Sequence, residues 1–107
     1  MVDDTQRVCF LLHLKPDRVE DYLAAHESVW PEMLAALTEA GWRNYSLFVQ
    51  PADGLVVGYF ETDDYDAAVA AMSGSDVNDR WQTTMSGYFD DRPDRATDRL
   101  THYFHLA

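Results

Sequence analysis

Residues 43–61 read RNYSLFVQPADGLVVGYFE, and this stretch decides the fold. Two strand-forming runs, Arg43 to Val49 and Leu55 to Glu61, flank the typical turn sequence Pro51-Ala52-Asp53-Gly54. Two strands joined by so short a turn form an antiparallel hairpin. In the second run the odd and the even positions are both largely apolar, so the pattern indicates a strand that is covered on both faces.

Upstream of the hairpin, the pattern predicts a strand followed by an interrupted helix. The strand spans Arg7 to Leu14, where apolar residues alternate. Asp17, with Glu20 three residues later, has the spacing of a capping box and predicts that a helix begins near residue 17. Pro31 removes a backbone donor and predicts a kink or a restart within that helix. Gly41 is expected to end it as the residue after the C-cap.

Downstream of the hairpin, the pattern predicts more helix and a final strand. Thr62 or Asp63 is expected to cap a helix that runs to about Met72, and Ser73-Gly74-Ser75 is expected to end it. Three further segments complete the chain: a helix over Asp76–Tyr88, a charged loop over Asp90–Asp98 and a strand over Leu100–Leu106.

The element order is therefore strand, helix, strand, strand, helix, strand. This βαββαβ order is the ferredoxin-like arrangement of the α+β class, an antiparallel sheet with helices on one face. We predict a single domain over residues 1–107. Because the strands look apolar on both faces, the second face needs a cover, and we expect a second copy of the chain to provide it. The expected assembly is a homodimer whose sheets face each other, a dimeric α+β barrel.

Composition and charge narrow the classes of partner. The chain has 107 residues and a formal net charge of −11, which repels nucleic acid and anionic membranes but not a small neutral sugar. No apolar run approaches the ~18–20 residues of a membrane span, and residues 1–6 lack the basic and apolar regions of a secretion signal. Cys9 is the single cysteine, so no disulfide within the chain is expected. These features favour a cytoplasmic protein.

Two pairs of residues are candidates for a site. Tyr22 and His26 stand four residues apart, so a helix places both on one face, where an imidazole moves protons near pH 7 and a phenol donates a hydrogen bond. Trp81 and Tyr45 offer aromatic faces and one donor each to a sugar ring. Spacing alone favours the other interpretation, that all four are packed core residues.

Metal and cofactor sites find little support in the sequence. His102 and His105 are an odd number of residues apart, so a strand turns their rings to opposite faces and they do not bind one ion together. Cys9 is interpreted as structural. No phosphate-binding glycine loop and no nucleophile-elbow motif is present. We therefore predict neither a metal nor a cofactor.

Three segments together resemble the L-rhamnose mutarotase family, from about residue 7 to 106. They are Tyr22-x-x-x-His26-x-x-x-Trp30-Pro31-Glu32, Gly41-Trp42-Arg43-Asn44-Tyr45 and Asp79-Arg80-Trp81. The resemblance implies a homodimer of ferredoxin-like subunits. It also implies an isomerase that interconverts the α and β anomers of L-rhamnose without cofactor or metal.

The resemblance also assigns roles to residues. The family's proton-donating histidine falls on His26, its sugar-binding tyrosines on Tyr22 and Tyr45, and its substrate-contacting tryptophan on Trp81. Where the family has a second tryptophan this chain has Gln82, which is expected to bind a sugar hydroxyl. Opening a pyranose needs an acid at the ring oxygen and a base at the anomeric hydroxyl. His26 is one candidate for the ring oxygen and Tyr22, or a water it holds, for the hydroxyl, with the acid and base roles left open.

The same scaffold hosts other functions, and two remain open here. One is a cofactor-independent monooxygenase or muconolactone-type isomerase, which would bind an apolar aromatic or lactone ligand and act on no sugar. The other is a non-catalytic sugar-binding module, which would keep its affinity after His26→Gln. The sequence also leaves open whether the sugar is L-rhamnose, L-fucose or another aldose.

Overall fold

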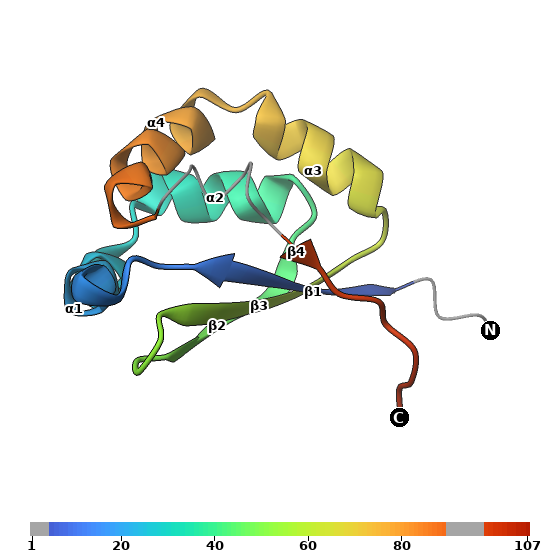
Figure 1. The fold of residues 1–107 in the computed structure, drawn as a ribbon. Helices are drawn as coiled ribbons and strands as arrows, with labels where there is room; N and C mark the ends of the chain where they lie inside the picture. The colour runs from blue at the N-terminus through green and yellow to red at the C-terminus, as the bar shows by residue number, and fades with distance from the viewer. Residues whose placement is uncertain (1–4, 90–97) are drawn as a thin grey trace.

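The computed structural model describes residues 5–89 and 98–107. In these residues a four-stranded antiparallel sheet forms one layer, and helices pack on one of its faces (Figure 1). The sheet order is β2-β3-β1-β4, which confirms the predicted ferredoxin-like topology. The strands are β1 (Gln6–His13), β2 (Arg43–Gln50), β3 (Leu55–Thr62) and β4 (Asp98–Arg99). The helices are α1 (Val19–Ala25), α2 (Pro31–Glu39), α3 (Tyr65–Ser73) and α4 (Asp76–Met85), with 3-10 turns η1 (Pro16–Arg18), η2 (His26–Ser28) and η3 (Ser86–Tyr88).

The predicted hairpin is confirmed as β2 and β3. Its turn closes with the amide of Gly54 donating to the carbonyl of Gln50 at 3.0 Å. Gly54 has a φ of 77°, a conformation that favours glycine, and a side chain there would meet the carbonyl oxygen of Leu14. The turn therefore also fixes the end of β1 beside the hairpin, since the Leu14 amide donates to the Gly54 carbonyl at 2.9 Å.

Proline and glycine set the bounds of α2 as predicted. Pro31 is the first residue of the helix, where its missing N–H costs nothing, and Trp30 before it is extended, with a ψ of 131°. At the other end Gly41 has a φ of 91°. The amides of Gly41 and Trp42 donate back to the carbonyls of Thr38 and Leu37, which is the Schellman ending. The predicted interruption of the first helix is thus a restart.

Two predicted helix caps are wrong. The capping box of Asp17 and Glu20 does not form, because the chain enters the helical segment through η1, and neither it nor α1 has a side-chain cap. The second helix begins later than predicted and is capped by Asp64, whose Oδ1 accepts from the amide of Ala67 at 3.1 Å. Thr62 is not available as a cap because it still belongs to β3, paired with Gln6.

The predicted last strand is also wrong. Within the described residues only Asp98 and Arg99 form β4, pairing with Leu11 and Phe10 of β1. Residues 100–107 have no regular secondary structure; they continue from β4 past the sheet toward the side away from the helices (Figure 1), and residues 100–105 line a small pocket with Arg7, Cys9 and Tyr59. The predicted loop at residues 90–97 lies outside the described residues, whereas Asp98, assigned to that loop, belongs to β4. Leu100 keeps one backbone bond to β1, its amide donating to the carbonyl of Cys9 at 2.8 Å, and beyond it residues 101–107 pair with no other described strand.

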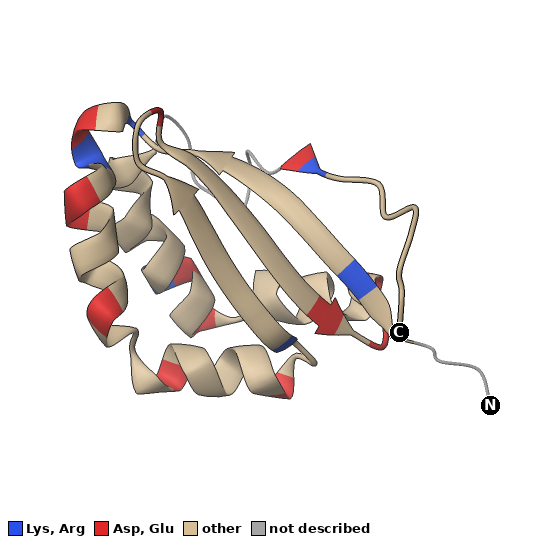
Figure 2. Cartoon of the chain, turned by 90° about the horizontal axis from the view of Figure 1, so that it is seen from below, with Lys and Arg blue, Asp and Glu red and all other residues tan. Residues whose placement is uncertain are grey.

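The two faces of the sheet differ. The face under the helices carries the buried residues of β1 and β3, including Val8, Phe10, Val56 and Phe60. The outer face keeps apolar residues partly or largely accessible, with Phe48 63% exposed. Figure 2, which looks onto this outer face, shows that charged residues gather on the helices and on the short β4, and that β1, β2 and β3 carry them only near one end of the sheet. No described helix is long and apolar enough to cross a membrane.

Candidate active site

A cavity of about 380 Å³ lies between the helices and the sheet. Its volume falls in the usual range for small-molecule sites. Its walls are mainly apolar and aromatic, and four of the five predicted site residues line it: His26, Tyr45, Trp81 and Gln82. The fifth, Tyr22, is not among the lining residues but contacts His26.

His26 lies where α1 passes into η2. Its Nδ1 is 3.1 Å from the carbonyl oxygen of Tyr22, one helical turn earlier. A carbonyl only accepts hydrogen bonds, so Nδ1 carries the proton and the neutral ring keeps its lone pair on Nε2. Burial lowers the pKa of His26 below the ordinary value of 6.5, and the bond to the carbonyl opposes this shift only in part. His26 is therefore a neutral base near pH 7.

Tyr22 supports His26. Tyr22 is buried, and its ring centroid lies 4.3 Å from that of His26. The Tyr22 ring also packs against the rings of Tyr88 and Phe89 in edge-on contacts. Burial raises the pKa of the Tyr22 phenol to about 12, so this group stays protonated across the physiological range.

A β-bulge turns Tyr45 into the cavity. Arg43 pairs with Glu61, but Ser46 pairs with Tyr59, so β2 contains one extra residue between these pairs. The extra residue reverses the alternation, and Tyr45 points toward the helices instead of the outer face. Asn44 absorbs the distortion with a φ of 49°, and its Nδ2 donates to Oε1 of Glu61 at 3.2 Å. A bulge thus positions this predicted site residue.

The Tyr45 phenol is desolvated although the residue as a whole is 38% exposed. Burial of the phenol raises its pKa, and repulsion between the phenolate forms of Tyr45 and Tyr22 raises it further. The ring is held by Trp42, Phe10 and Phe60, at centroid distances of 5.1, 6.3 and 6.0 Å. Tyr45 therefore presents a protonated hydroxyl on a fixed ring.

Trp81 forms an aromatic wall next to His26. It is buried on α4, and its ring meets that of His26 at 5.5 Å in an edge-on contact. Trp30 supports it from behind at 5.0 Å, also edge-on. The indole therefore has a fixed orientation beside the candidate base, which suits stacking against an apolar face of a sugar ring.

Gln82 is oriented by a buried asparagine that the sequence did not reveal as a site residue. The Nδ2 of Asn78 donates to the carbonyl of Met72 at 2.9 Å, which leaves its Oδ1 to accept from the Nε2 of Gln82 at 3.1 Å. The Oε1 of Gln82 is thereby left for a ligand. Asn78 sits one turn before Gln82 on α4, and this i, i+4 spacing was the available signal for the pair.

Arg99 is a charged lining residue that the sequence analysis missed. It lies in β4, between the predicted loop (Asp90–Asp98) and the predicted strand (Leu100–Leu106), and the pairing of β4 with β1 brings it to the cavity. Among the described residues no group of three or more histidine, cysteine or acidic side chains is placed to hold a metal ion.

Comparisons with known proteins agree with this arrangement. A family model described as L-rhamnose mutarotase matches residues 7–106. An L-rhamnose mutarotase of Oceanobacillus iheyensis is 32% identical over 105 residues, covering 94% of this chain and 98% of its own length.

Two solved structures share the fold. The crystal structure of an L-rhamnose mutarotase from Formosa agariphila superposes with a TM-score of 0.81 at 18% identity, covering 95% of this chain and 99% of its own. A structure from Nitrosomonas europaea, whose name refers to an antibiotic biosynthesis monooxygenase, superposes with a TM-score of 0.64 at 13% identity, covering 94% and 89%. The fold is therefore shared with other functions, whereas the match over residues 7–106 is specific: the chain belongs to the L-rhamnose mutarotase family.

Proposed function

We propose that this chain interconverts the α and β anomers of L-rhamnose, or of a closely related sugar, by acid- and base-assisted ring opening in the cavity beside His26. The observation that carries the proposal is a neutral histidine with its Nε2 lone pair left free, in one cavity with a protonated phenol. Mutarotation requires these two proton-handling groups and no electron sink. Saturation-transfer NMR, which measures exchange between the two anomeric protons, tests it.

In the proposed opening step, Nε2 of His26 takes the proton of the anomeric hydroxyl as the bond between the anomeric carbon and the ring oxygen breaks. The ring oxygen takes the phenolic proton of Tyr45. The aldehyde then rotates, the ring oxygen attacks its other face and returns its proton to Tyr45, and His26 reprotonates the anomeric oxygen. Each proton is thus returned, and the catalyst is unchanged after a turnover.

The proposed mechanism assigns the acid and base roles that the sequence left open. A histidine that is neutral at pH 7 is a better base than acid, and a tyrosine with a raised pKa is a donor. Tyr45 lines the cavity and Tyr22 does not, so we assign the acid role to Tyr45. Tyr22 then positions His26 through its ring and its backbone carbonyl.

Trp81 and Gln82 bind and orient the sugar in this proposal. The fixed indole of Trp81 stacks on the C–H face of the pyranose, and Oε1 of Gln82 accepts from a hydroxyl. Such a site serves a neutral polar ring. An apolar aromatic ligand would leave the phenol and the oriented amide unpaired, and a lactone ring without hydroxyls would leave Oε1 of Gln82 without a donor, which weighs against a monooxygenase or lactone isomerase. A non-catalytic sugar-binding module would not need a free base beside the acid.

The acid limb of the pH profile is the first expected result. Because the neutral form of His26 is the base, kcat/KM should rise with pH through a pKa below 6.5 and then stay level to pH 9. Both tyrosines remain protonated over that range. Initial rates of anomer exchange, recorded from pH 4.5 to 9 and corrected for the uncatalysed rate, test this. A profile that falls between pH 6 and 8 would identify His26 as the acid instead.

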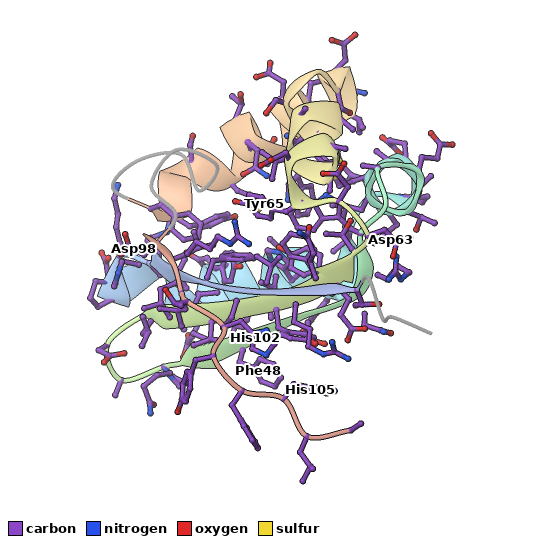
Figure 3. All side chains as sticks on the ribbon, turned by 90° about the vertical axis from the view of Figure 1, so that its right-hand side faces the viewer. Phe48, Asp63, Tyr65, Asp98, His102 and His105 are labelled. Carbon is purple, nitrogen blue, oxygen red and sulfur yellow. The ribbon has the colours of Figure 1, made fainter. Side chains whose placement is uncertain are left out.

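We further propose that the chain works as a homodimer in the cytoplasm, with a second copy covering the outer face of the sheet. Residues 100–107 carry Tyr103, Phe104 and Leu106 at 94, 71 and 80% exposed, and Phe48 of the edge strand β2 is 63% exposed. Figure 3 shows Phe48 and the tail residues His102 and His105 on the side of the sheet away from the helices.

The lengths of these segments match. β2 has eight residues and is an edge strand among the described residues, and in the tail over residues 100–107 only the Leu100 amide is paired with β1. In a two-fold dimer the tail of each subunit can therefore lie along β2 of the other, which covers both exposed sets at once.

Phe48→Glu is expected to convert the dimer to monomers, because it places a charge in the buried centre of the proposed interface. Size-exclusion chromatography with light scattering measures the mass. Leu23→Glu, which charges an exposed leucine of α1 outside this face, is the matched control and should leave a dimer. A wild-type monomer, or a dimeric Phe48→Glu variant, would contradict the proposal.

A further inference from the structure

Arg99 brings a positive charge into the cavity wall at a place that the mechanism does not use. Its Cζ lies 3.7 Å from the ring centroid of Tyr65, the first residue of α3. Tyr65 is supported by Phe60, with nearly parallel rings 6.4 Å apart, and Figure 3 shows it between α3 and the sheet. A ring face holds a guanidinium without taking its in-plane N–H donors, so those donors are left for a ligand.

Arg99 differs in charge from the other residues that line the cavity. The chain has 19 acidic and 8 basic residues, yet among the described residues that line the cavity there is no aspartate or glutamate, and Arg99 is the one lysine or arginine. A guanidinium presents its donors as a rigid fork that matches two neighbouring oxygen atoms. The cavity thus offers a site for a pair of oxygens on a ligand.

Arg99 and His26 lie at different ends of this cavity. His26 is held by α1 and by Trp81 of α4, whereas Arg99 is held by β4 and the start of α3. Ring contacts lead from Arg99 through Tyr65 and Phe60 to Tyr45. In a pyranose, carbons 3 and 4 lie across the ring from the anomeric carbon. A sugar with its anomeric carbon at His26 therefore directs its 3- and 4-hydroxyls toward the other end.

We propose that Arg99, backed by Tyr65, is a specificity-determining residue that binds the adjacent 3- and 4-hydroxyls of the substrate. The inference rests on the proposed mutarotase function, since His26 sets the position of the anomeric carbon. It names the substrate class: aldopyranoses with free neighbouring hydroxyls at positions 3 and 4.

The test removes either the guanidinium of Arg99 or the 4-hydroxyl of the sugar. Wild type and Arg99→Gln are compared on L-rhamnose and on its 4-deoxy analogue by anomer-exchange NMR over a range of sugar concentrations. We expect each single change to raise KM by about 10- to 100-fold, as for the loss of a hydrogen bond to a charged group, with kcat within a few-fold. The two changes together should cost no more than one, because both remove the same contact.

Two further variants keep the result interpretable. Arg43→Gln removes an arginine of the outer face, paired with Asp63, and should leave the KM for L-rhamnose unchanged. Arg99→Lys keeps the charge without the fork and should fall between wild type and Arg99→Gln. Should Arg99→Gln fail to fold, Arg99→Lys replaces it in the comparison.

Independent losses that multiply, or an unchanged KM in Arg99→Gln, would overturn the assignment. If wild type accelerates exchange on no sugar, the proposed function fails. NMR titration of wild type and Arg99→Gln with L-rhamnose then decides the binding role separately: equal affinities overturn it, and weaker binding by Arg99→Gln supports it.

Discussion

His26→Gln is expected to lower catalysed anomer exchange by about 10²- to 10⁴-fold, the usual contribution of a positioned general base. Glutamine has no group that takes a proton near pH 7, so the anomeric hydroxyl loses its acceptor. Trp81 and Tyr45 keep their own supports, Trp30 for the first and Trp42 for the second, so the sugar should still bind. The loss should therefore appear in kcat, with the dissociation constant for L-rhamnose changed by only a few-fold.

The matched control is His13→Gln. His13 is the last residue of β1 and is exposed, 3.7 Å from Asp98 and outside the cavity. This variant should keep the wild-type rate. Full activity of His26→Gln would show that His26 is not the general base. Loss of sugar binding in the same variant would show that His26 is a binding residue.

Tyr45→Phe is expected to cost at least about 100-fold in kcat, because the ring oxygen loses its proton donor. Its ring contacts with Trp42, Phe10 and Phe60 do not involve the hydroxyl, so thermal stability should stay close to that of wild type. The rate is measured by the same exchange experiment, and the melting temperature by circular dichroism.

Tyr22→Phe is the informative comparison for Tyr45→Phe. It keeps the ring beside His26 and the backbone carbonyl that accepts from Nδ1, and removes only the phenol. We expect a change of a few-fold at most. Equal losses in the two variants would mean that both phenols take part in proton transfer, and a loss confined to Tyr22→Phe would reverse the assignment.

Much of the fold could be predicted from local patterns because local interactions produce it. Each signal acts over a few residues: the alternation of apolar residues, the Pro51–Gly54 turn, Pro31 and Gly41. The structure accordingly has the expected hairpin, the helix restart at Pro31 and the helix end at Gly41. The prediction of the last strand was wrong for a physical reason. Leu100–Leu106 has the composition of a strand, but a strand forms only when it pairs with another, and along β1 the pairing of this segment ends with the bond from the Leu100 amide to the Cys9 carbonyl.

The site was harder to predict because its geometry comes from contacts between distant segments. The spacing of Tyr22 and His26 indicated one shared helix face, and the structure confirms that they touch. The orientation of Tyr45 depends on a bulge at Asn44, which alternation alone does not reveal. Arg99 reaches the cavity only through the pairing of β4 with β1, which no local pattern encodes.

The measurement that tests the central claim most directly is saturation-transfer NMR on equilibrated L-rhamnose, with L-fucose and D-glucose alongside. Catalytic amounts of wild type or of His26→Gln are added, and exchange between the α and β anomeric protons is recorded. The account predicts accelerated exchange on L-rhamnose with wild type and a rate near the uncatalysed one with His26→Gln. Acceleration on another sugar alone would keep the reaction and change the substrate. No acceleration on any sugar would contradict the account.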